Sequence, residues 1–206
     1  MIVVVDYGVG NIGAIGNMFD YLGIETRTSA DPSEIASAAQ IVLPGVGAFD
    51  RAMAALREAD LVGPLNEAVL ARKASVLGVC LGMQLFARRS DEGIEPGLGW
   101  IDADVRRMEV EPSSGLKVPN IGWNVIVPER NSRLFDQEDI TARFYFDHSY
   151  YVACDNSTDV SASIEFAGAK CCAVERGNIS GVQFHPEKSH RHGMRLLRRW
   201  ATKSQP

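Results

Sequence analysis

A cysteine stands between two glycines in the stretch Ser75-Val76-Leu77-Gly78-Val79-Cys80-Leu81-Gly82-Met83-Gln84. The apolar run at 76–79 is typical of a buried strand, and the segment 83–88 that follows has helical character. A sharp turn from a strand into a helix, with a reactive side chain at its tip, is the nucleophile elbow, here with sulfur in place of oxygen. The stretch therefore predicts a parallel sheet with Cys80 projecting above its carboxyl edge.

The residues around Cys80 suit a reactive thiol. Gly78 and Gly82 lack Cβ atoms, so a strained turn can close between them. A thiol at the start of a helix also has its thiolate form favoured by the helix dipole and by free N–H groups. A buried structural cysteine, the alternative interpretation, gains nothing from this geometry. Cys80 is therefore the candidate nucleophile.

On both sides of the elbow, short strand-like runs alternate with other elements in a way that predicts an α/β fold. The first half pairs β-branched runs with amphipathic segments, which is typical of a parallel sheet flanked by helices. The second half has many short runs separated by turns, which predicts additional antiparallel strands and a mixed, mainly parallel central sheet. The predicted helices are 12–22, 48–61, 65–71, 83–88 and a C-terminal helix; the predicted strands are 2–5, 24–28, 41–43, 76–79, 101–107, 121–127, 143–146, 150–153, 160–164, 172–175 and 181–184.

Length and charge limit the possible classes of protein. The 206 residues, 46% of them hydrophobic, predict a single domain over residues 1–206. With no leader and no apolar run near the roughly 20 residues of a membrane span, we expect a cytoplasmic protein without a membrane partner. The net charge of −5 gives no reason to expect nucleic-acid binding. A basic set near the C-terminus is interpreted as the solvated face of the last helix, with a partner contact as the alternative: Lys188, Arg191, Arg195, Arg198, Arg199 and Lys203.

The other three cysteines, Cys154, Cys171 and Cys172, form no CxxC pair. We interpret them as reduced, small buried hydrophobic residues. A metal site would need His190 or His192 to join them, and we expect neither a metal nor another cofactor.

A cysteine nucleophile needs a base, and the chain has four histidines. His185 follows the predicted strand 181–184, and Glu187 lies two residues further on, where a carboxylate can turn back to orient the imidazole. His148, at the end of an aromatic strand, is the alternative base. His190 and His192 fall in the charged terminal helix, where surface roles are expected. The sequence thus favours a Cys80, His185 and Glu187 system.

A tetrahedral intermediate also needs donors for its oxyanion. The segment Pro44-Gly45-Val46-Gly47 follows a predicted strand and so reaches the same carboxyl edge as Cys80. Glycines let backbone N–H groups approach a substrate oxygen, and one such donor is worth about 3–4 kcal/mol in the transition state. The candidate oxyanion residues are Gly45, Val46, Gly47 and, next after the nucleophile, Leu81.

Near the N-terminus, Gly8, Gly10 and Gly13 have the G-x-G-x-x-G spacing of a dinucleotide-binding turn. The second predicted strand, 24–28, ends without the acidic residue that would bind a ribose. A glycine-permitted tight turn is the alternative. A dinucleotide-binding module and a non-catalytic interaction domain are therefore the competing classes of function.

Four segments together resemble the class I glutamine amidotransferases: PGVGAF at 44–49, GVCLGMQLF at 78–86, GWN at 122–124 and GVQFHPEKS at 181–189. The resemblance covers essentially the whole chain and implies a flavodoxin-like fold. It implies that Cys80 attacks the side-chain amide of L-glutamine to release glutamate and ammonia, with His185 moving protons and Glu187 orienting it. It also implies that Gln84, Ser149 and Tyr150 bind the substrate.

Within this family, the chain is similar to the glutaminase subunits of histidine biosynthesis. The similarity implies a heterodimer with a (β/α)8 cyclase of the HisF type, which takes the ammonia and makes imidazole glycerol phosphate and aminoimidazole carboxamide ribotide. It further implies that the partner's ligand rearranges the segment 45–47. The positions matching the partner interface are Asn120, Trp123, Tyr145 and Lys188.

Asn120 departs from the family pattern, which usually has histidine before the GWN segment. Asparagine cannot titrate or make the same contacts as an imidazole. Close paralogues with this type of sequence feed ammonia to sugar-amidating enzymes of surface-polysaccharide pathways. The sequence therefore predicts the chemistry and leaves a choice between two pathways.

Overall fold

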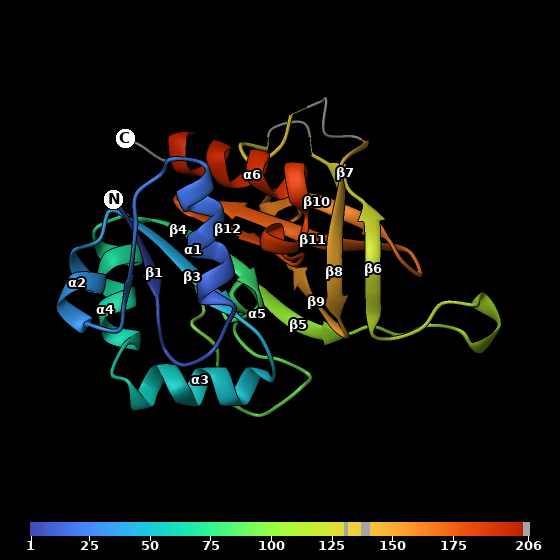
Figure 1. The fold of residues 1–206 in the computed structure, drawn as a ribbon. Helices are drawn as coiled ribbons and strands as arrows, with labels where there is room; N and C mark the ends of the chain where they lie inside the picture. The colour runs from blue at the N-terminus through green and yellow to red at the C-terminus, as the bar shows by residue number, and fades with distance from the viewer. Residues whose placement is uncertain (130–131, 137–140, 204–206) are drawn as a thin grey trace.

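The computed structural model of the chain describes residues 1–129, 132–136 and 141–203. An eight-stranded sheet lies between two layers of helices (Figure 1). Its first five strands are parallel and the last three join antiparallel, so the predicted α/β class with a mixed sheet is confirmed. In spatial order the strands are β2 (Thr26–Ser29), β1 (Ile2–Val5), β3 (Gln40–Gly45), β4 (Ser75–Cys80), β12 (Ile179–Val182), β11 (Ala169–Arg176), β10 (Val160–Glu165) and β7 (Val127–Pro128).

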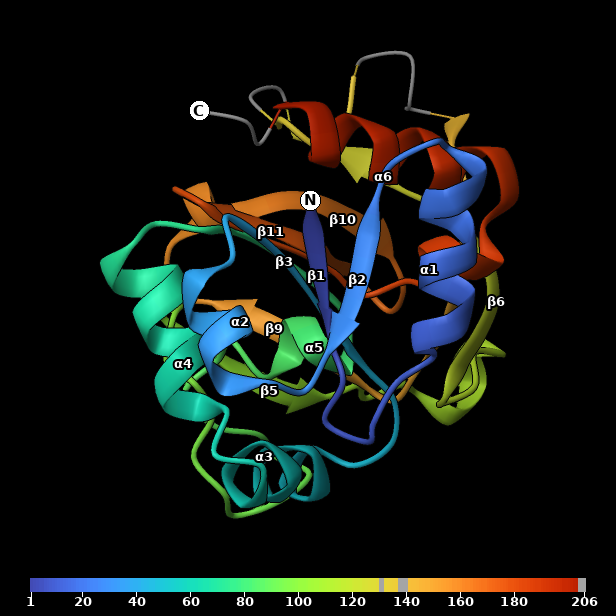
Figure 2. The same ribbon diagram turned by 60° about the vertical axis from the view of Figure 1, so that its left-hand side comes forward.

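The helices cover both faces of the sheet. Helices α1 (Ile12–Tyr21) and α6 (His190–Lys203) lie on one face, and α2 (Pro32–Ser37), α3 (Phe49–Glu58) and α4 (Val62–Asn66) lie on the other (Figure 2). A π-helical turn, η1 (Glu67–Ala71), continues α4.

Side-chain alternation along the strands divides the core into two layers. On β1, Ile2 and Val4 belong to the layer under α1 and α6, where Trp200 and Phe19 lie, whereas Val3 belongs to the opposite layer. All four residues of β1 are buried. A strand that is buried on both faces requires a continuous apolar run, which explains the β-branched residues of the parallel strands.

Two small antiparallel sheets stand beside the carboxyl edge of the main sheet. The strands β5 (Ala103–Arg107) and β9 (Tyr150–Cys154) form one, and β6 (Asn120–Val125) and β8 (Arg143–His148) form the other. A single bridge between Tyr145 and His185 connects β8 to the chain beyond β12. These additions wall the edge at which the parallel strands end.

Several predicted boundaries were wrong. The helix predicted at 83–88 is the single turn α5 (Leu81–Gln84), because Arg88 donates its N–H to the carbonyl of Ala103 instead of continuing the helix. The strand predicted at 181–184 ends at Val182, since His185 pairs with Tyr145. The strand predicted at 121–127 is divided into β6 and β7. Helix α2, which was not predicted, begins after an Asp31 side chain that accepts two backbone N–H bonds.

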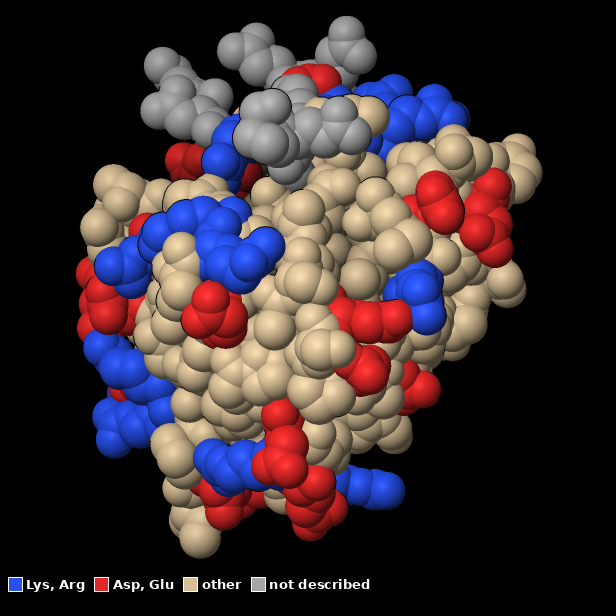
Figure 3. Space-filling view, turned by 90° about the vertical axis from the view of Figure 1, so that its left-hand side faces the viewer, with Lys and Arg blue, Asp and Glu red and all other residues tan. Residues whose placement is uncertain are grey.

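Charged side chains are distributed over most of the surface, and the described part of the face in Figure 3 shows Lys and Arg beside Asp and Glu in small groups. On α6, Arg191, Arg195 and Arg198 are exposed as predicted. Arg199 is not part of that solvated face: its side chain is 11% exposed and donates to the carbonyl of Leu134. The side chain of Lys203 lies outside the described part. Within the described ranges, every helix is too short or too polar to cross a membrane.

Candidate active site

A cavity of about 540 Å³ opens at the carboxyl edge of the sheet. Candidate residues from four separate stretches of the chain meet there, 46–47, 80–84, 148–150 and 185–188, although they were predicted one motif at a time. The lining residues are Val46, Gly47, Cys80, Leu81, Gln84, Glu92, Pro119, Asp147, His148, Ser149, Tyr150, His185 and Lys188. The cavity therefore brings the predicted nucleophile, base and substrate-binding residues together.

The turn at Cys80 is strained and tightly packed. Cys80 has φ +55°, a value that residues with a side chain rarely adopt. A Cβ on Gly82 would lie 1.9 Å from the carbonyl oxygen of Leu43, and one on Gly78 would lie 2.6 Å from Phe86. Both glycines are thus needed because neighbouring backbone and side chains occupy the space. Because α5 has only four residues, its dipole favours a thiolate less than the dipole of a longer helix would.

The segment after β3 lies beside the nucleophile. Gly45 pairs with Cys80 in the sheet, and Val46 and Gly47 line the cavity. Gly47 has φ +94°, and Leu81 begins α5, where its N–H has no intrahelical acceptor. The backbone N–H groups of this segment and of Leu81 therefore lie beside Cys80. Their role as oxyanion donors stays a prediction.

The N-terminal glycine motif supports this segment. The hydroxyl of Tyr7 donates to the carbonyl of Pro44 at 2.6 Å, and burial together with the nearby Cys80 raises the pKa of Tyr7, so the hydroxyl keeps its proton. A Cβ on Gly10 would lie 2.9 Å from the Cβ of Pro44. Gly8, Gly10 and Gly13 are not among the cavity-lining residues. The motif is therefore a tight turn packed against Pro44. This packing explains why position 10 is a glycine, and no bound dinucleotide is needed to explain it.

The imidazole of His185 lies between the thiol and a carboxylate. Its Nδ1 is 2.8 Å from Oε1 of Glu187, and it also hydrogen-bonds with Cys80. Burial lowers the pKa of His185, but the hydrogen bonds to Cys80 and Glu187 outweigh it and raise the pKa to about 10. The arrangement therefore favours an imidazolium next to the sulfur.

Ser189, which the sequence did not single out, fixes the turn that bears His185. Its hydroxyl donates to the carbonyl of His185 at 2.6 Å and accepts from the backbone N–H of Tyr145 at 3.0 Å. Ser189 is fully buried. The bonds join the turn after β12 to strand β8, so the position of the imidazole depends on both.

His148, the alternative base, has both ring nitrogens occupied by other partners. Its Nδ1 lies 2.7 Å from the carbonyl oxygen of Tyr150, which can only accept, so Nδ1 is the donor. Its Nε2 then accepts from the amide of Asn120 at 3.1 Å. Burial lowers the pKa of His148 to about 4. His148 is therefore a neutral, fully engaged side chain, and the geometry favours His185 as the base.

The residues expected to bind the substrate line the same cavity as Cys80. Gln84, Ser149 and Tyr150 line the cavity, and the amide of Gln84 donates to the carbonyl of Tyr150 at 3.3 Å. Glu92 also lines the cavity and was not predicted. Its carboxylate accepts from the N–H of Phe49 at 2.9 Å. No local motif marks Glu92, because it lies in an irregular loop.

Three of the four predicted partner residues contact one another at the rim. The ring of Trp123 meets that of Tyr145 edge-on at 6.0 Å, and the Lys188 ammonium lies 5.4 Å from the Tyr145 ring. Trp123 also stacks on His190. Asn120 is buried and bonds to His148, so its effect on any surface is indirect.

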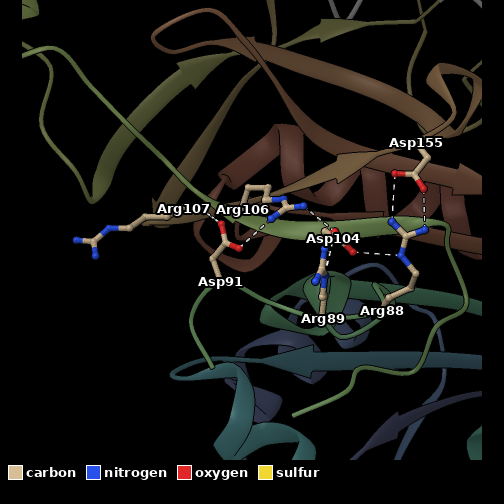
Figure 4. A network of polar contacts seen from close by, with 7 residues as sticks. All are labelled: Arg88, Arg89, Asp91, Asp104, Arg106, Arg107 and Asp155. Atoms are coloured by element: carbon tan, nitrogen blue, oxygen red, sulfur yellow. Dashed lines mark hydrogen bonds and ion pairs between the residues drawn. The ribbon is translucent and has the colours of Figure 1, made fainter. Parts of the chain in front are cut away.

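A network of arginines and aspartates holds the small sheet with β9 against the segment after α5 (Figure 4). The Asp104 carboxylate accepts from Arg88, Arg89 and Arg106, and Arg88 also binds Asp155. The hydrogen bond from Arg89 lowers the pKa of Asp104, so it stays ionised. Because β9 begins at the cavity with Tyr150, the network helps to position that wall.

Comparisons with known proteins agree with this geometry. The family described as "Glutamine amidotransferase class-I" matches residues 3–203. The chain is 43% identical to "Imidazole glycerol phosphate synthase subunit HisH" of Leptospira interrogans, with 98% of this chain and 100% of that protein covered. It is 45% identical to the subunit of the same name from Bdellovibrio bacteriovorus, with 98% and 99% covered. A solved structure described as "Crystal structure of glutamine amidotransferase" has a TM-score of 0.75 at 17% identity over 99% of both chains, which shows a shared fold.

Proposed function

The chain belongs to the class I glutamine amidotransferases, and within them to the HisH subunits of imidazole glycerol phosphate synthase, and we propose that Cys80, His185 and Glu187 hydrolyse L-glutamine in it. The observation that supports this assignment most directly is the hydrogen-bonded series from the Cys80 thiol through His185 to Glu187 at the wall of the cavity. The chain is thus an enzyme whose product ammonia serves a partner subunit.

The proposed reaction uses His185 in the protonated form that the site favours. The Cys80 thiolate attacks the amide carbon, and the oxyanion forms beside the backbone N–H groups of 46–47 and Leu81. The His185 imidazolium gives its proton to the amide nitrogen, ammonia leaves, and a glutamyl thioester remains. His185 then takes a proton from water, which attacks the thioester and releases glutamate and the thiolate.

The part of the cavity lined by Glu92 and Gln84 suits the amino-acid end of the substrate. Free glutamine carries an α-ammonium group, and the Glu92 carboxylate, held by the N–H of Phe49, is the half-buried anion in that part. Gln84 offers the carbonyl end of its amide, because its nitrogen is bound to Tyr150. We assign Glu92 to the ammonium group and Gln84 to orienting the chain of the substrate.

The ammonia acceptor is a cyclase subunit, and a row of exposed apolar side chains beside the cavity suits it. Alternate residues along β6 and into β7 are 44–59% exposed, which is unusual for apolar side chains in such a row. We call this row the β6 face: Ile121, Trp123, Val125 and Val127. The rim residues Tyr145 and Lys188 adjoin it, so a partner docked there would cover the cavity mouth.

The test is glutamine hydrolysis by the purified chain alone and with a histidine-pathway cyclase and its nucleotide ligand. We expect slow hydrolysis that the cyclase stimulates strongly and that Cys80→Ala abolishes. Wild-type rates in Cys80→Ala would refute the mechanism. Stimulation only by a sugar-amidating synthase would refute the pathway and leave the chemistry intact.

A further inference from the structure

Gln183 contacts the nucleophile without lining the cavity. Its side chain is completely buried just beyond β12, and its Nε2 lies 3.7 Å from the Sγ of Cys80. We infer that Gln183 is a positioning residue, which holds the Cys80 thiolate with a permanent amide donor on the side away from the substrate. The inference rests on the proposed role of Cys80 as nucleophile.

The direction of this amide is fixed by a chain of hydrogen bonds. The carbonyl of Tyr150 can only accept, so the amide of Gln84 presents its nitrogen there, at 3.3 Å. The same nitrogen lies 3.0 Å from Gln183, which must therefore present its oxygen to Gln84. The remaining end of the Gln183 amide, its NH₂ group, then faces the sulfur. Reversing it would place two donors against each other and an oxygen against a thiolate.

The chain of hydrogen bonds continues to strand β6. The carbonyl of Tyr150 also accepts from Nδ1 of His148, whose Nε2 accepts from Asn120, and Asn124 in turn donates to Asn120 at 3.2 Å. Each side chain in this network has a hydrogen-bond partner that permits only one orientation of its polar group. Strand β6, which is distant in sequence, therefore helps to fix the orientation of the Gln183 amide.

Two donors then meet the sulfur, and they differ in one respect. His185 loses its donor proton during the reaction, whereas an amide does not titrate. A donor to the charged form favours that form, and the effect is stronger in a buried site. Gln183 thus adds to the thiolate, which forms beside the imidazolium, a donor whose strength does not depend on the proton that His185 carries.

The experiment measures the rate at which iodoacetamide alkylates Cys80 between pH 5 and 10, by peptide mass spectrometry on the full-length chain. Gln183→Met removes the donor and keeps an unbranched side chain. We expect the pH at which the alkylation rate is half-maximal to rise by about one unit. At a pH below that midpoint, the alkylation rate should fall about tenfold. The matched control is Gln40→Met, because Gln40 is also a buried amide donor, bound to the carbonyl of Ala201; its profile should equal wild type.

Gln183→Glu provides a second measurement, which serves alone if the methionine variant does not fold. A carboxylate beside the sulfur should move the profile further upward than methionine does. A profile of either folded variant that coincides with wild type would overturn the inference. Labelling of wild-type Cys80 by a diazoketone analogue of glutamine is run in parallel. Absence of that label with a shifted Gln183 profile would refute the proposed function and keep the positioning role.

Discussion

The Nδ1 of His185 lies 2.8 Å from Oε1 of Glu187, and the two side chains are only 4% and 1% exposed. The other carboxylate oxygen, Oε2, accepts no hydrogen bond from any residue in the described ranges. A buried carboxylate with so few donors has its charge compensated mainly by the imidazole. The pair therefore stabilises an imidazolium and fixes Nδ1 as the protonated nitrogen of the neutral ring.

We expect Glu187→Gln to lower partner-stimulated glutamine hydrolysis by roughly 100- to 10,000-fold, because the amide keeps the shape but not the charge that orients the ring. Steady-state ammonia release measures it. The matched control is Glu175→Gln, since Glu175 is also a largely buried carboxylate, bound to Ser132 and Ser161 on another part of the sheet. Equal losses in both variants would show a general structural effect and refute the orienting role.

The convergence of Cys80 and His185 could be predicted from the sequence because both follow parallel strands, and such strands end at one edge. The residues that hold them could not. Ser189 and Gln183 act through contacts with Tyr145 and Gln84, which lie 44 and 99 residues away, and no spacing rule specifies such a pairing. The helix after Cys80 was predicted to be too long, because it ends where the N–H of Arg88 bonds to the carbonyl of Ala103 in β5, a contact that the local sequence does not show.

A second prediction concerns the dependence of stability on pH. Burial lowers the pKa of His148 to about 4, whereas an unfolded histidine titrates near 6.5. Between these values the unfolded chain binds more protons, so the contribution of His148 makes the free energy of unfolding fall as the pH drops from about 6.5 to about 4. Between pH 7 and pH 4.5, the free energy of unfolding of His148→Asn should therefore fall by about 2 kcal/mol less than that of the wild type.

Urea denaturation at the two pH values measures this difference. His190→Asn is the control, because His190 is exposed at the start of α6 and should leave the wild-type pH dependence unchanged. A His148→Asn variant with the full acid loss would show that other groups cause it. Glutamine hydrolysis by His148→Asn and by His185→Asn tests the choice of base: loss in His148→Asn but not in His185→Asn would mean that the wrong histidine was assigned.

A third prediction concerns the β6 face. Trp123 is 46% exposed and lies at its centre, where large aromatic side chains dominate binding energy. Trp123→Ala should weaken association with the cyclase by about 2 kcal/mol or more, roughly 30-fold in Kd, with little change in thermal stability. Calorimetric titration measures it. Tyr21→Ala, which removes a 79% exposed aromatic ring from α1, should leave the Kd unchanged. An unaltered Kd in Trp123→Ala would place the cyclase on another surface.

The last prediction concerns the glycine after the nucleophile. A Cβ at Gly82 would lie 1.9 Å from the carbonyl oxygen of Leu43, and backbone on both sides prevents either group from yielding. Gly82→Ala should therefore lower the free energy of unfolding by about 3 kcal/mol or more and displace Cys80.

The control is Gly16, which lies within α1, where an added Cβ would have no neighbouring atom within 4 Å. Gly16→Ala should therefore raise the free energy of unfolding by about 0.5–1 kcal/mol. Urea denaturation of both variants distinguishes a steric clash of the added methyl group from an effect of helix propensity. If Gly82→Ala unfolds like wild type, the close approach of β3 to the elbow does not constrain the turn, and the strain at Cys80 needs another cause.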